Sequence, residues 1–269
     1  MEANPVVSAR FPFDRDTRKY RHVHANPRPT FSPDRPEGAP VPGRERESRY
    51  STCGCRAAAG AGMRSAIILV GGEAKRANGK EKYFFTYRGR TFIERLTESL
   101  RQVTDEIVIV AKDPVQCRRF DSLEGVRCIA DIRPGIGPIG GLHAGALAAE
   151  GELVFVSACD MPCIDPAVVR HLFDRIGDCD AAIPSWNADM LEPLHAVYRR
   201  SALLSYLESH ASLSLRTMVR ELSTCYVPVE ELRAIDPGLV TFTNINKLEE
   251  LERMNARAGP AGTGELPDE

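Results

Sequence analysis

The sequence contains no apolar run that approaches the roughly 20 residues of a membrane-spanning helix. One of its longest runs, Ala66-Ile67-Ile68-Leu69-Val70, has the length of a buried strand instead. The first residues also lack the apolar core of a signal peptide. We therefore expect a cytoplasmic protein that has no membrane partner.

An excess of charge of either sign is also missing, because the formal net charge is −2 at pH 7. The chain as a whole has no general attraction for nucleic acid, so we expect no nucleic-acid partner. The eight cysteines lack the spacing of a zinc site, since neither Cys53-Gly54-Cys55 nor the pair Cys159 and Cys163 comes with a second CxxC or a histidine pair. We expect inert thiols, without metal or disulfide bonds.

Residues 1–62 differ in composition from the rest. They contain 8 of the 19 prolines and have 11 Lys and Arg against 7 acidic residues, whereas residues 63–269 have 24 against 30. Such a segment buries too little apolar surface to offset the entropy of ordering. We expect a disordered N-terminal extension, with a basic arm for an acidic partner as the alternative. Residues 258–269 are expected to be a loose C-terminal tail.

From residue 63 on, apolar strands alternate with helices. The predicted strands are 65–70, 106–111, 126–130, 153–158, 181–184, 226–229 and 239–243. The predicted helices are 91–103, 141–149, 166–176, 201–209, 213–222 and 246–257. Strands that are apolar on both faces indicate a mostly parallel sheet covered by helices on both sides. We therefore predict a three-layer, Rossmann-like α/β domain over residues 63–257.

The loop after the first strand has a pattern typical of phosphate binding. It contains Leu69-Val70-Gly71-Gly72 and then two cations, Arg76 and Lys82. Paired glycines let the backbone approach a ligand, and their N–H groups can hold phosphate. The two cations suit a triphosphate. The loop matches neither GxxxxGK[ST] nor GxGxxG, so a simple turn is the alternative.

Two further loops each place an aspartate at the end of a predicted strand. Asp131 opens a Gly- and Pro-rich loop, and Asp160 follows the strand 153–158. A carboxylate at the end of a buried strand is costly to desolvate unless it is paired or binds a metal. Mg²⁺ commonly takes one or two carboxylates and phosphate oxygens, so Asp160 is a candidate ligand for Mg²⁺. Capping of a turn is the alternative for both residues.

Together these stretches resemble the molybdenum cofactor guanylyltransferases, within the GT-A-like nucleotidyltransferases. The resemblance covers residues 66–257, about 70% of the chain. It is carried by the first loop with Arg76 and Lys82, by Asp131 with Pro138-Ile139-Gly140-Gly141, by Cys159-Asp160-Met161-Pro162, by Glu192-Pro193-Leu194-His195-Ala196 and by Phe242-Thr243-Asn244-Ile245-Asn246. The last two stretches favour the molybdopterin branch. Val70 and Ala77-Asn78 stand where the family usually has Ala and Met-Gly.

The resemblance implies a nucleotidyltransferase that moves GMP from GTP to the phosphate of molybdopterin and releases pyrophosphate. It implies that Lys82, Arg76 and Asp160 are catalytic and that Asp160 holds Mg²⁺. The implied nucleotide-binding residues are Leu69, Val70, Gly71, Gly72, Lys82, Asp131 and Asp160. The implied acceptor-binding residues are Glu192, His195, Asn244 and Asn246. Other cofactor-biosynthesis proteins are expected as transient partners.

Two alternatives remain open from the sequence. The same chemistry fits CTP with molybdopterin, or a sugar-phosphate or phospholactate acceptor. A nucleotide-binding adaptor without turnover is a different class, against which Lys82, Asp131 and Asp160 argue together. On the acceptor side, His195 could instead be a structural residue, and Asn244 and Asn246 could cap the last helix.

We predict that a protein beginning at Met63 folds and keeps its activity. The first predicted strand starts at about residue 65, and a central parallel strand finds its hydrogen-bond partners within the sheet rather than in a Pro-rich segment. A loss of 1 kcal/mol would lower Tm by only about 2–4 °C at this size. Side-by-side melting and guanylyl-transfer assays of the two proteins test this, and an insoluble or inactive short form would contradict it.

Overall fold

A seven-stranded sheet forms the centre of the protein in this computed structural model, which describes residues 62–71, 81–210, 214–245, 251–252 and 255–256. The strand order is β5-β4-β1-β6-β8-β7-β9. The strands are β1 (Arg64–Leu69), β4 (Glu106–Ala111), β5 (Val126–Ala130), β6 (Leu153–Ala158), β7 (Ala181–Ser185), β8 (His195–Arg199) and β9 (Thr224–Pro228). Strand β8 is antiparallel to both of its neighbours, and the other pairings are parallel. The predicted mostly parallel sheet is confirmed.

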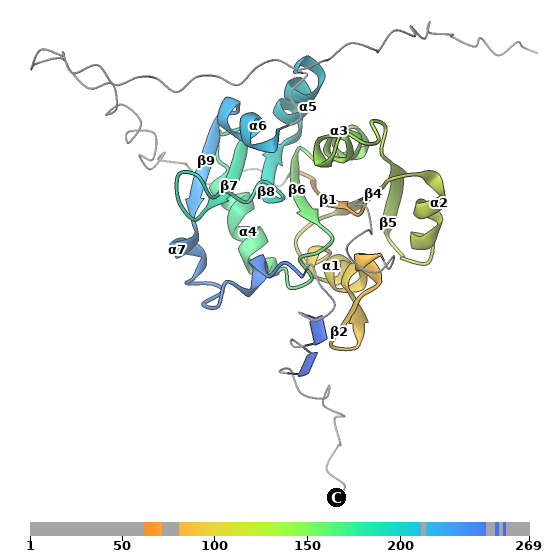
Figure 1. The fold of residues 1–269 in the computed structure, drawn as a ribbon. Coiled ribbons are helices and arrows are strands. Elements are labelled where there is room, and N and C mark those ends of the chain that lie inside the picture. The colour runs from red at the N-terminus through yellow and green to blue at the C-terminus, as the bar shows by residue number, and fades with distance from the viewer. Residues whose placement is uncertain (1–61, 72–80, 211–213, 246–250, 253–254, 257–269) are drawn as a thin grey trace, which may run out of the picture. The chain divides into compact units, whose positions relative to one another are not determined.

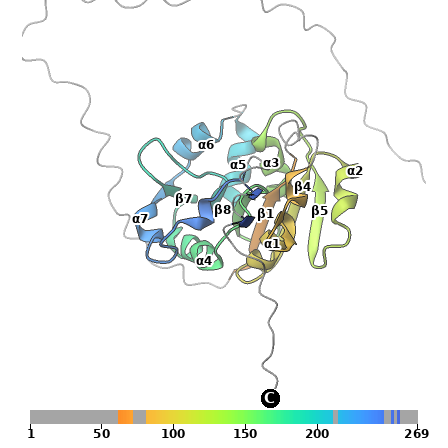
Figure 2. The same cartoon turned by 60° about the horizontal axis from the view of Figure 1, so that its bottom comes forward.

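Helices cover both faces of this sheet (Figure 1). One face packs against α1 (Phe92–Leu100), α4 (Pro166–Arg175) and the short α7 (Val229–Leu232). The other face packs against α3 (Pro138–Ala148), α5 (Arg200–Ser209) and α6 (Leu215–Glu221). Figure 2 shows the same separation of the two helical layers from a second direction. The three-layer prediction is therefore confirmed.

The alternation of side chains along β1 explains why both faces need cover. Ala66 and Ile68 belong to the core on the α1 side, whereas Ile67 belongs to the core on the α3 side. All three are fully buried. A strand with apolar residues on both faces is stable only between two layers, which is what the continuous apolar run predicted.

Local sequence signals fix the starts of two helices on the α1 side. Thr91 caps α1 through a capping box, in which its hydroxyl accepts from the backbone N–H of Glu94 and the Glu94 carboxylate accepts from the Thr91 N–H at 2.8 Å. Asp165 caps α4, and Pro166 occupies the first helical position, as predicted. These caps place the N-terminus of α4 just after the loop that contains Asp160.

The secondary structure departs from the prediction in several places. Residues 239–243 form no strand but the 3-10 helix η5 (Val240–Phe242), because Leu239 adopts a left-handed backbone and Asp236 accepts from the Thr241 N–H at 2.8 Å. Strand β8 was not predicted, although it fills the space between β6 and β7. Helix α3 begins three residues earlier than predicted, at Pro138. The predicted helix 246–257 lies largely outside the described residues, as do residues 1–61 and 257–269.

A hairpin and a short helix complete the part of the chain that contains Lys82. The 3-10 helix η3 (Lys82–Phe84) leads into strands β2 (Thr86–Tyr87) and β3 (Arg90–Thr91), which pair antiparallel. After β4 come α2 (Pro114–Cys117) and the 3-10 helix η4 (Arg118–Phe120), next to β4 and β5. None of the helices among the described residues is long and apolar enough to cross a membrane.

We predict that Gly145→Val destabilises the protein, because α3 approaches the sheet too closely for a side chain. A Cβ at position 145 would lie 2.6 Å from Cγ2 of Ile67 and 3.1 Å from Cγ2 of Val110. Overpacking of this kind costs about 1–3 kcal/mol. Thermal melting should show a Tm several degrees lower. Leu147→Val is the control, since Leu147 is 46% exposed on the same helix and the change also introduces a β-branched residue. Equal losses in the two variants would contradict the close-packing explanation.

Candidate functional site

Lys82 and Asp160 form an ion pair at the carboxyl end of the sheet. The Lys82 Nζ lies 3.1 Å from Asp160 Oδ2, and the two side chains are 23% and 17% exposed. One comes from η3 and the other follows β6, so the fold brings together two residues that are 78 positions apart. The sequence predicted both residues for the site, and the structure places them in direct contact.

The backbone on each side of Asp160 is fixed by two hydrogen bonds. The Cys159 N–H donates to the Leu69 carbonyl at 3.1 Å, which extends the pairing of β6 with β1 beyond the last strand residue. The Ile245 N–H donates to the Asp160 carbonyl at 2.9 Å. Asp160 therefore lies between the end of β1 and the segment that contains Asn244, two stretches that the sequence assigned to the same site.

The second oxygen of Asp160 is suited to a cation. Oδ1 is buried and has no hydrogen-bond partner among the described residues. A buried carboxylate oxygen without a partner is expensive unless another group satisfies it. Mg²⁺ takes few protein ligands and completes its shell with water and phosphate oxygens. One such oxygen fits that pattern, and the described residues contain no cluster of three or more His, Cys, Asp or Glu that would form an all-protein metal site.

Asp131 is held at the first turn of α3. Its backbone N–H donates to the Ala111 carbonyl at 2.7 Å, and its Oδ1 accepts from the Arg133 N–H at 2.7 Å. A Cβ on Gly140 would lie 3.0 Å from each carboxylate oxygen and 2.6 Å from the Arg133 carbonyl. Glycine at position 140 therefore leaves the space that the Asp131 carboxylate occupies, a role that the sequence did not reveal.

The start of the first loop lies beside the end of β4. Val70 donates to the Val110 carbonyl at 3.0 Å, and a Cβ on Gly71 would be 3.4 Å from the backbone nitrogen of Lys112. Gly71 is exposed, so its backbone is accessible to a ligand. Gly72 and Arg76 lie outside the described residues.

On the proposed acceptor side, Glu192 and His195 belong to one aromatic cluster. Glu192 Oε1 accepts from the Trp186 indole at 2.9 Å, and burial raises the pKa of the Glu192 carboxyl. Trp186 and His195 both pack against Phe242, with ring centroids 5.7 and 4.8 Å away. The Asn244 side chain is exposed, next to the contact between Ile245 and Asp160. Asn246 lies outside the described residues.

His195 is fully buried and neutral. Its Nε2 lies 3.3 Å from the Thr241 hydroxyl, and its ring packs edge-on against Phe155 at 5.1 Å. Burial lowers the pKa of His195 to about 3. The ring contacts Thr241 and Phe242 and so supports the 240–245 segment from the protein interior. This is the structural role that the sequence left open.

A network beside Lys82 was not predicted. Glu81, Tyr83, Gln116 and Arg119 are joined by hydrogen bonds next to the lysine. Glu81 and Tyr83 adjoin Lys82 in the sequence, but Gln116 and Arg119 come from α2 and η4. Nothing in their spacing indicated that they would meet this segment.

The cysteines behave as simple thiols in the described part of the chain. Its six cysteines form no disulfide with one another. Burial, together with the neighbouring Asp160 charge, raises the pKa of Cys159 to about 12. This thiol therefore stays protonated at neutral pH, although it adjoins the site. Cys53 and Cys55 lie outside the described residues.

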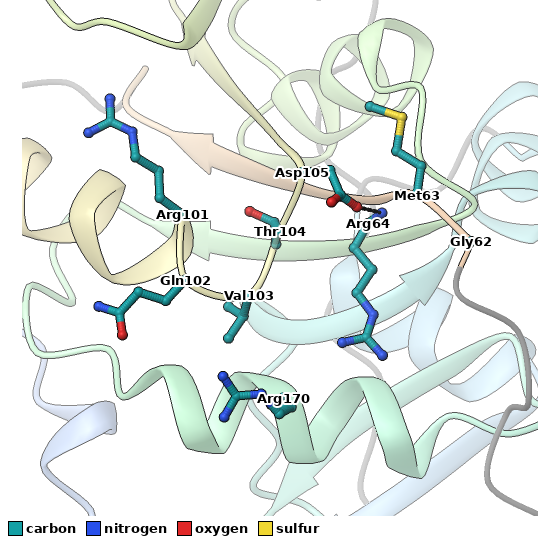
Figure 3. Close-up of a pocket in the computed structure, with 9 residues that line it drawn as sticks. All are labelled: Gly62, Met63, Arg64, Arg101, Gln102, Val103, Thr104, Asp105 and Arg170. Carbon is teal, nitrogen blue, oxygen red and sulfur yellow. Dashed lines mark hydrogen bonds between the residues drawn. The ribbon is translucent and has the colours of Figure 1, made fainter.

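A hollow of about 690 Å³ lies at the opposite end of the sheet (Figure 3). It is lined at the amino ends of β1 and β4 by residues that include Arg64, Arg101, Asp105 and Arg170. Arg64 already pairs with Asp174 at 3.6 Å, and Arg101 donates to the Glu124 carbonyl. Parallel α/β sheets bind ligands at the carboxyl ends of their strands. The Lys82 and Asp160 end is therefore the better candidate site.

Comparison with known proteins gives one consistent result. A MobA-like NTP transferase domain matches residues 66–225. The molybdenum cofactor guanylyltransferase of Desulfosudis oleivorans is 37% identical over 194 residues, which is 71% of this chain and 93% of that protein. A Methanosarcina acetivorans protein of the same name, qualified as probable, is 39% identical over 71% of this chain and 89% of its own. The crystal structure of molybdopterin-guanine dinucleotide biosynthesis protein A from Archaeoglobus fulgidus is 33% identical, with a TM-score of 0.61 over 72% of this chain and 98% of that one.

We predict that His195 makes folding stability depend on pH. Its pKa is lowered on folding, so below about pH 6.5 the unfolded chain binds a proton that the folded chain does not. Stability should therefore fall as the pH decreases from 6.5 toward 3, by up to about 1.4 kcal/mol per pH unit. Urea unfolding of the wild type and of His195→Gln between pH 7.5 and 5.0 measures the difference. The raised pKa of Glu192 acts in the opposite direction but is shared by both proteins. Equal slopes would show that His195 does not titrate as described.

Proposed function

Because the chain belongs to the MobA-like NTP transferase family, and is a nucleotidyltransferase of its molybdenum cofactor guanylyltransferase branch, we propose that it transfers GMP from GTP to the phosphate of molybdopterin. The products are molybdopterin guanine dinucleotide and pyrophosphate. The observation that carries the proposal is the Lys82 and Asp160 pair at 3.1 Å, with a second carboxylate oxygen left for a cation. We also propose that the reaction takes place in the cytoplasm.

The reaction is an in-line displacement at the α-phosphorus of GTP. An oxygen of the acceptor phosphate forms the new P–O bond, and the bond from the α-phosphorus to the oxygen that bridges to the β-phosphate breaks. Pyrophosphate leaves with that electron pair. The acceptor phosphate is already ionised at pH 7, so the protein needs no general base. Its task is to hold two mutually repelling anions in line and to stabilise the charge on the leaving group.

Lys82 supplies a positive charge for the phosphates. An ammonium group has three donors in flexible positions, which suits contact with both a carboxylate and phosphate oxygens. Arg76, which follows Gly72 by four positions, is proposed to share the charge of the β- and γ-phosphates. The backbone of Leu69, Val70, Gly71 and Gly72 is proposed to hold the nucleotide.

Asp160 is the proposed ligand of Mg²⁺, through the oxygen that has no partner in the described chain. Bound there, the metal would supply positive charge to the triphosphate oxygens. Asp131 is proposed to contact the nucleoside or to assist the metal, because α3 and Arg133 fix its carboxylate at the same edge of the sheet.

Glu192, Asn244 and Asn246 are proposed to bind the acceptor. Asn244 is exposed beside Asp160, which is where a second phosphate must approach. His195 contributes to the acceptor side by supporting this segment through Thr241. Transient contact with proteins that supply or receive the cofactor follows from the same proposal.

An assay of pyrophosphate release tests the function. The protein is incubated with Mg²⁺ and each of ATP, GTP, CTP and UTP, in the presence of molybdopterin, a sugar phosphate or phospholactate. Release that requires GTP and molybdopterin supports the proposal. Release with CTP, or with another acceptor, would assign the related activities instead. Nucleotide binding without release under any of these conditions would identify a non-catalytic adaptor.

We predict that Asp160→Asn abolishes turnover and leaves the fold intact. The change keeps the size of the side chain but removes the charge that attracts Mg²⁺ and pairs with Lys82. The rate should fall on the order of 10²-fold or more. The matched control is Asp174→Asn, an exposed aspartate at the opposite end of the sheet that also pairs with a cation. Product formation near the wild-type rate at limiting Mg²⁺ would refute the role of Asp160.

A further inference from the structure

We propose that Gln116 is a positioning residue for Lys82, and this inference rests on the function proposed above. The side-chain amide of Gln116 donates to the residues on each side of Lys82 and not to Lys82 itself. It holds the two residues that flank Lys82 and, at the same time, the end of the strand beside the first loop. The proposal therefore concerns how the protein keeps its main phosphate-binding charge in place.

The carboxamide of Gln116 is buried and nearly saturated with hydrogen bonds. Gln116 is 2% exposed. Its Nε2 donates to Glu81 Oε1 at 3.0 Å and to the Tyr83 hydroxyl at 3.2 Å, while its Oε1 accepts from the Lys112 N–H at 2.8 Å. The orientation of the amide is settled by chemistry, because the Lys112 N–H can only donate and a carboxylate can only accept.

Glu81 and Tyr83 are fixed on each side of Lys82. Tyr83 is 1% exposed and packs against Phe120, with ring centroids 4.9 Å apart. The Glu81 carboxylate also accepts from Tyr83 and from the Arg119 guanidinium. With both neighbours anchored, the backbone at Lys82 has one orientation, and its side chain reaches Asp160. A long, flexible lysine loses less entropy on binding phosphate when its backbone is already held.

The other half of the carboxamide acts on the nucleotide loop. Lys112 follows β4, and its backbone nitrogen is the atom nearest to a Cβ placed on Gly71. The preceding residue, Ala111, accepts from the Asp131 N–H at 2.7 Å. One buried amide thus connects the segment of Lys82 to the strand end that borders both Gly71 and Asp131. Helix α2, capped by Asp113, carries the amide to this point, since the Asp113 side chain accepts from the Gln116 N–H at 2.7 Å.

Only an amide of this length meets both requirements. Glutamate at position 116 offers no donor to Glu81 and places a second negative charge beside it. Methionine has a similar shape, but it can neither donate to the Glu81 carboxylate nor replace the amide oxygen that accepts from the Lys112 N–H. Both changes are expected to loosen the Lys82 segment while the apolar core around it stays in place.

A double-mutant cycle tests whether Gln116 acts through Lys82. The catalytic efficiency kcat/KM for GTP and the GTP affinity without acceptor are measured for the wild type, Gln116→Met, Lys82→Ala and the double variant. Gln116→Met should lower both quantities about tenfold in the wild type and less than twofold in the Lys82→Ala protein. A residue with a purely structural role would cause the same loss in both backgrounds, and that outcome would overturn the proposal.

Three further measurements keep the test decisive. Melting curves show whether each variant is folded at the assay temperature. If Gln116→Met is not, Tyr83→Phe, which removes one hydroxyl of the network, takes its place in the cycle with the same coupled result expected. Gln102→Met is the matched control, because Gln102 is an exposed glutamine whose side chain donates a long bond to the Glu98 carbonyl at 3.4 Å. It should leave both quantities unchanged.

The outcomes separate this inference from the proposed function. If the wild type releases no pyrophosphate from GTP and molybdopterin, the proposed function fails. If the wild type does release pyrophosphate, but Lys82→Ala changes neither the GTP affinity nor kcat/KM for GTP, then Lys82 does not bind phosphate. In that case the inference fails and the proposed function stands. The inference also fails if Lys82→Ala weakens GTP binding and the loss caused by Gln116→Met persists in the double variant.

Discussion

The structure depends on the burial of strand β1 between two parallel neighbours and two helical layers. Its backbone pairs with β4 on one side and with β6 on the other, and its central side chains Ala66, Ile67 and Ile68 are fully buried. Parallel strands that pair in register end at one edge of the sheet. This constraint brings the loops after β1, β4 and β6 to the same place, and with them the residues of the site.

Helix α3 packs closely against this central strand, and this packing places Asp131 at the candidate site. Gly145 lies against Ile67, and Gly141 lies against Leu69 near the end of β1. Because the helix is so near, its first turn reaches the carboxyl edge of the sheet, where Gly140 makes room for Asp131. The small residues of α3 therefore serve packing along most of the helix and the arrangement of a charged side chain at its start.

Two charges of the candidate site, those of Lys82 and Asp160, are paired with each other. The attraction between a partly buried lysine and a partly buried aspartate offsets part of the free energy that each charge loses by desolvation. The same holds for Glu81 and Arg119 behind them. Such pairing keeps a strong positive charge next to a negative one at an edge that is proposed to receive a triphosphate.

The sequence alone determined the fold class and indicated the residues of the candidate site. Continuous apolar runs at residues 65–70, 106–111 and 153–158 predicted buried parallel strands, because only a strand covered on both faces tolerates apolar residues at every position. Asp160 follows the last of these runs. It was recognisable as a candidate site residue because a charge at the end of a buried strand needs a partner. The resemblance to known guanylyltransferases, a family membership that the comparisons confirm, suggested the acceptor that is proposed.

Only the tertiary structure decided which distant residues meet. The sequence of β8 does not stand out as a separate strand, because the chain continues directly from it into helix α5. Its position between β6 and β7 is visible only in the assembled sheet. Residues 239–243 were predicted to form a strand. The Asp236 carboxylate instead accepts a hydrogen bond from the Thr241 N–H, and the chain forms the 3-10 helix η5 there. Nothing in the sequence indicated a role for Gln116. Its role depends on hydrogen bonds to Glu81, Tyr83 and Lys112, which come from two other segments of the chain. Periodicity reports which face of an element is buried, whereas a hydrogen bond between segments depends on where the packed elements place each donor and acceptor.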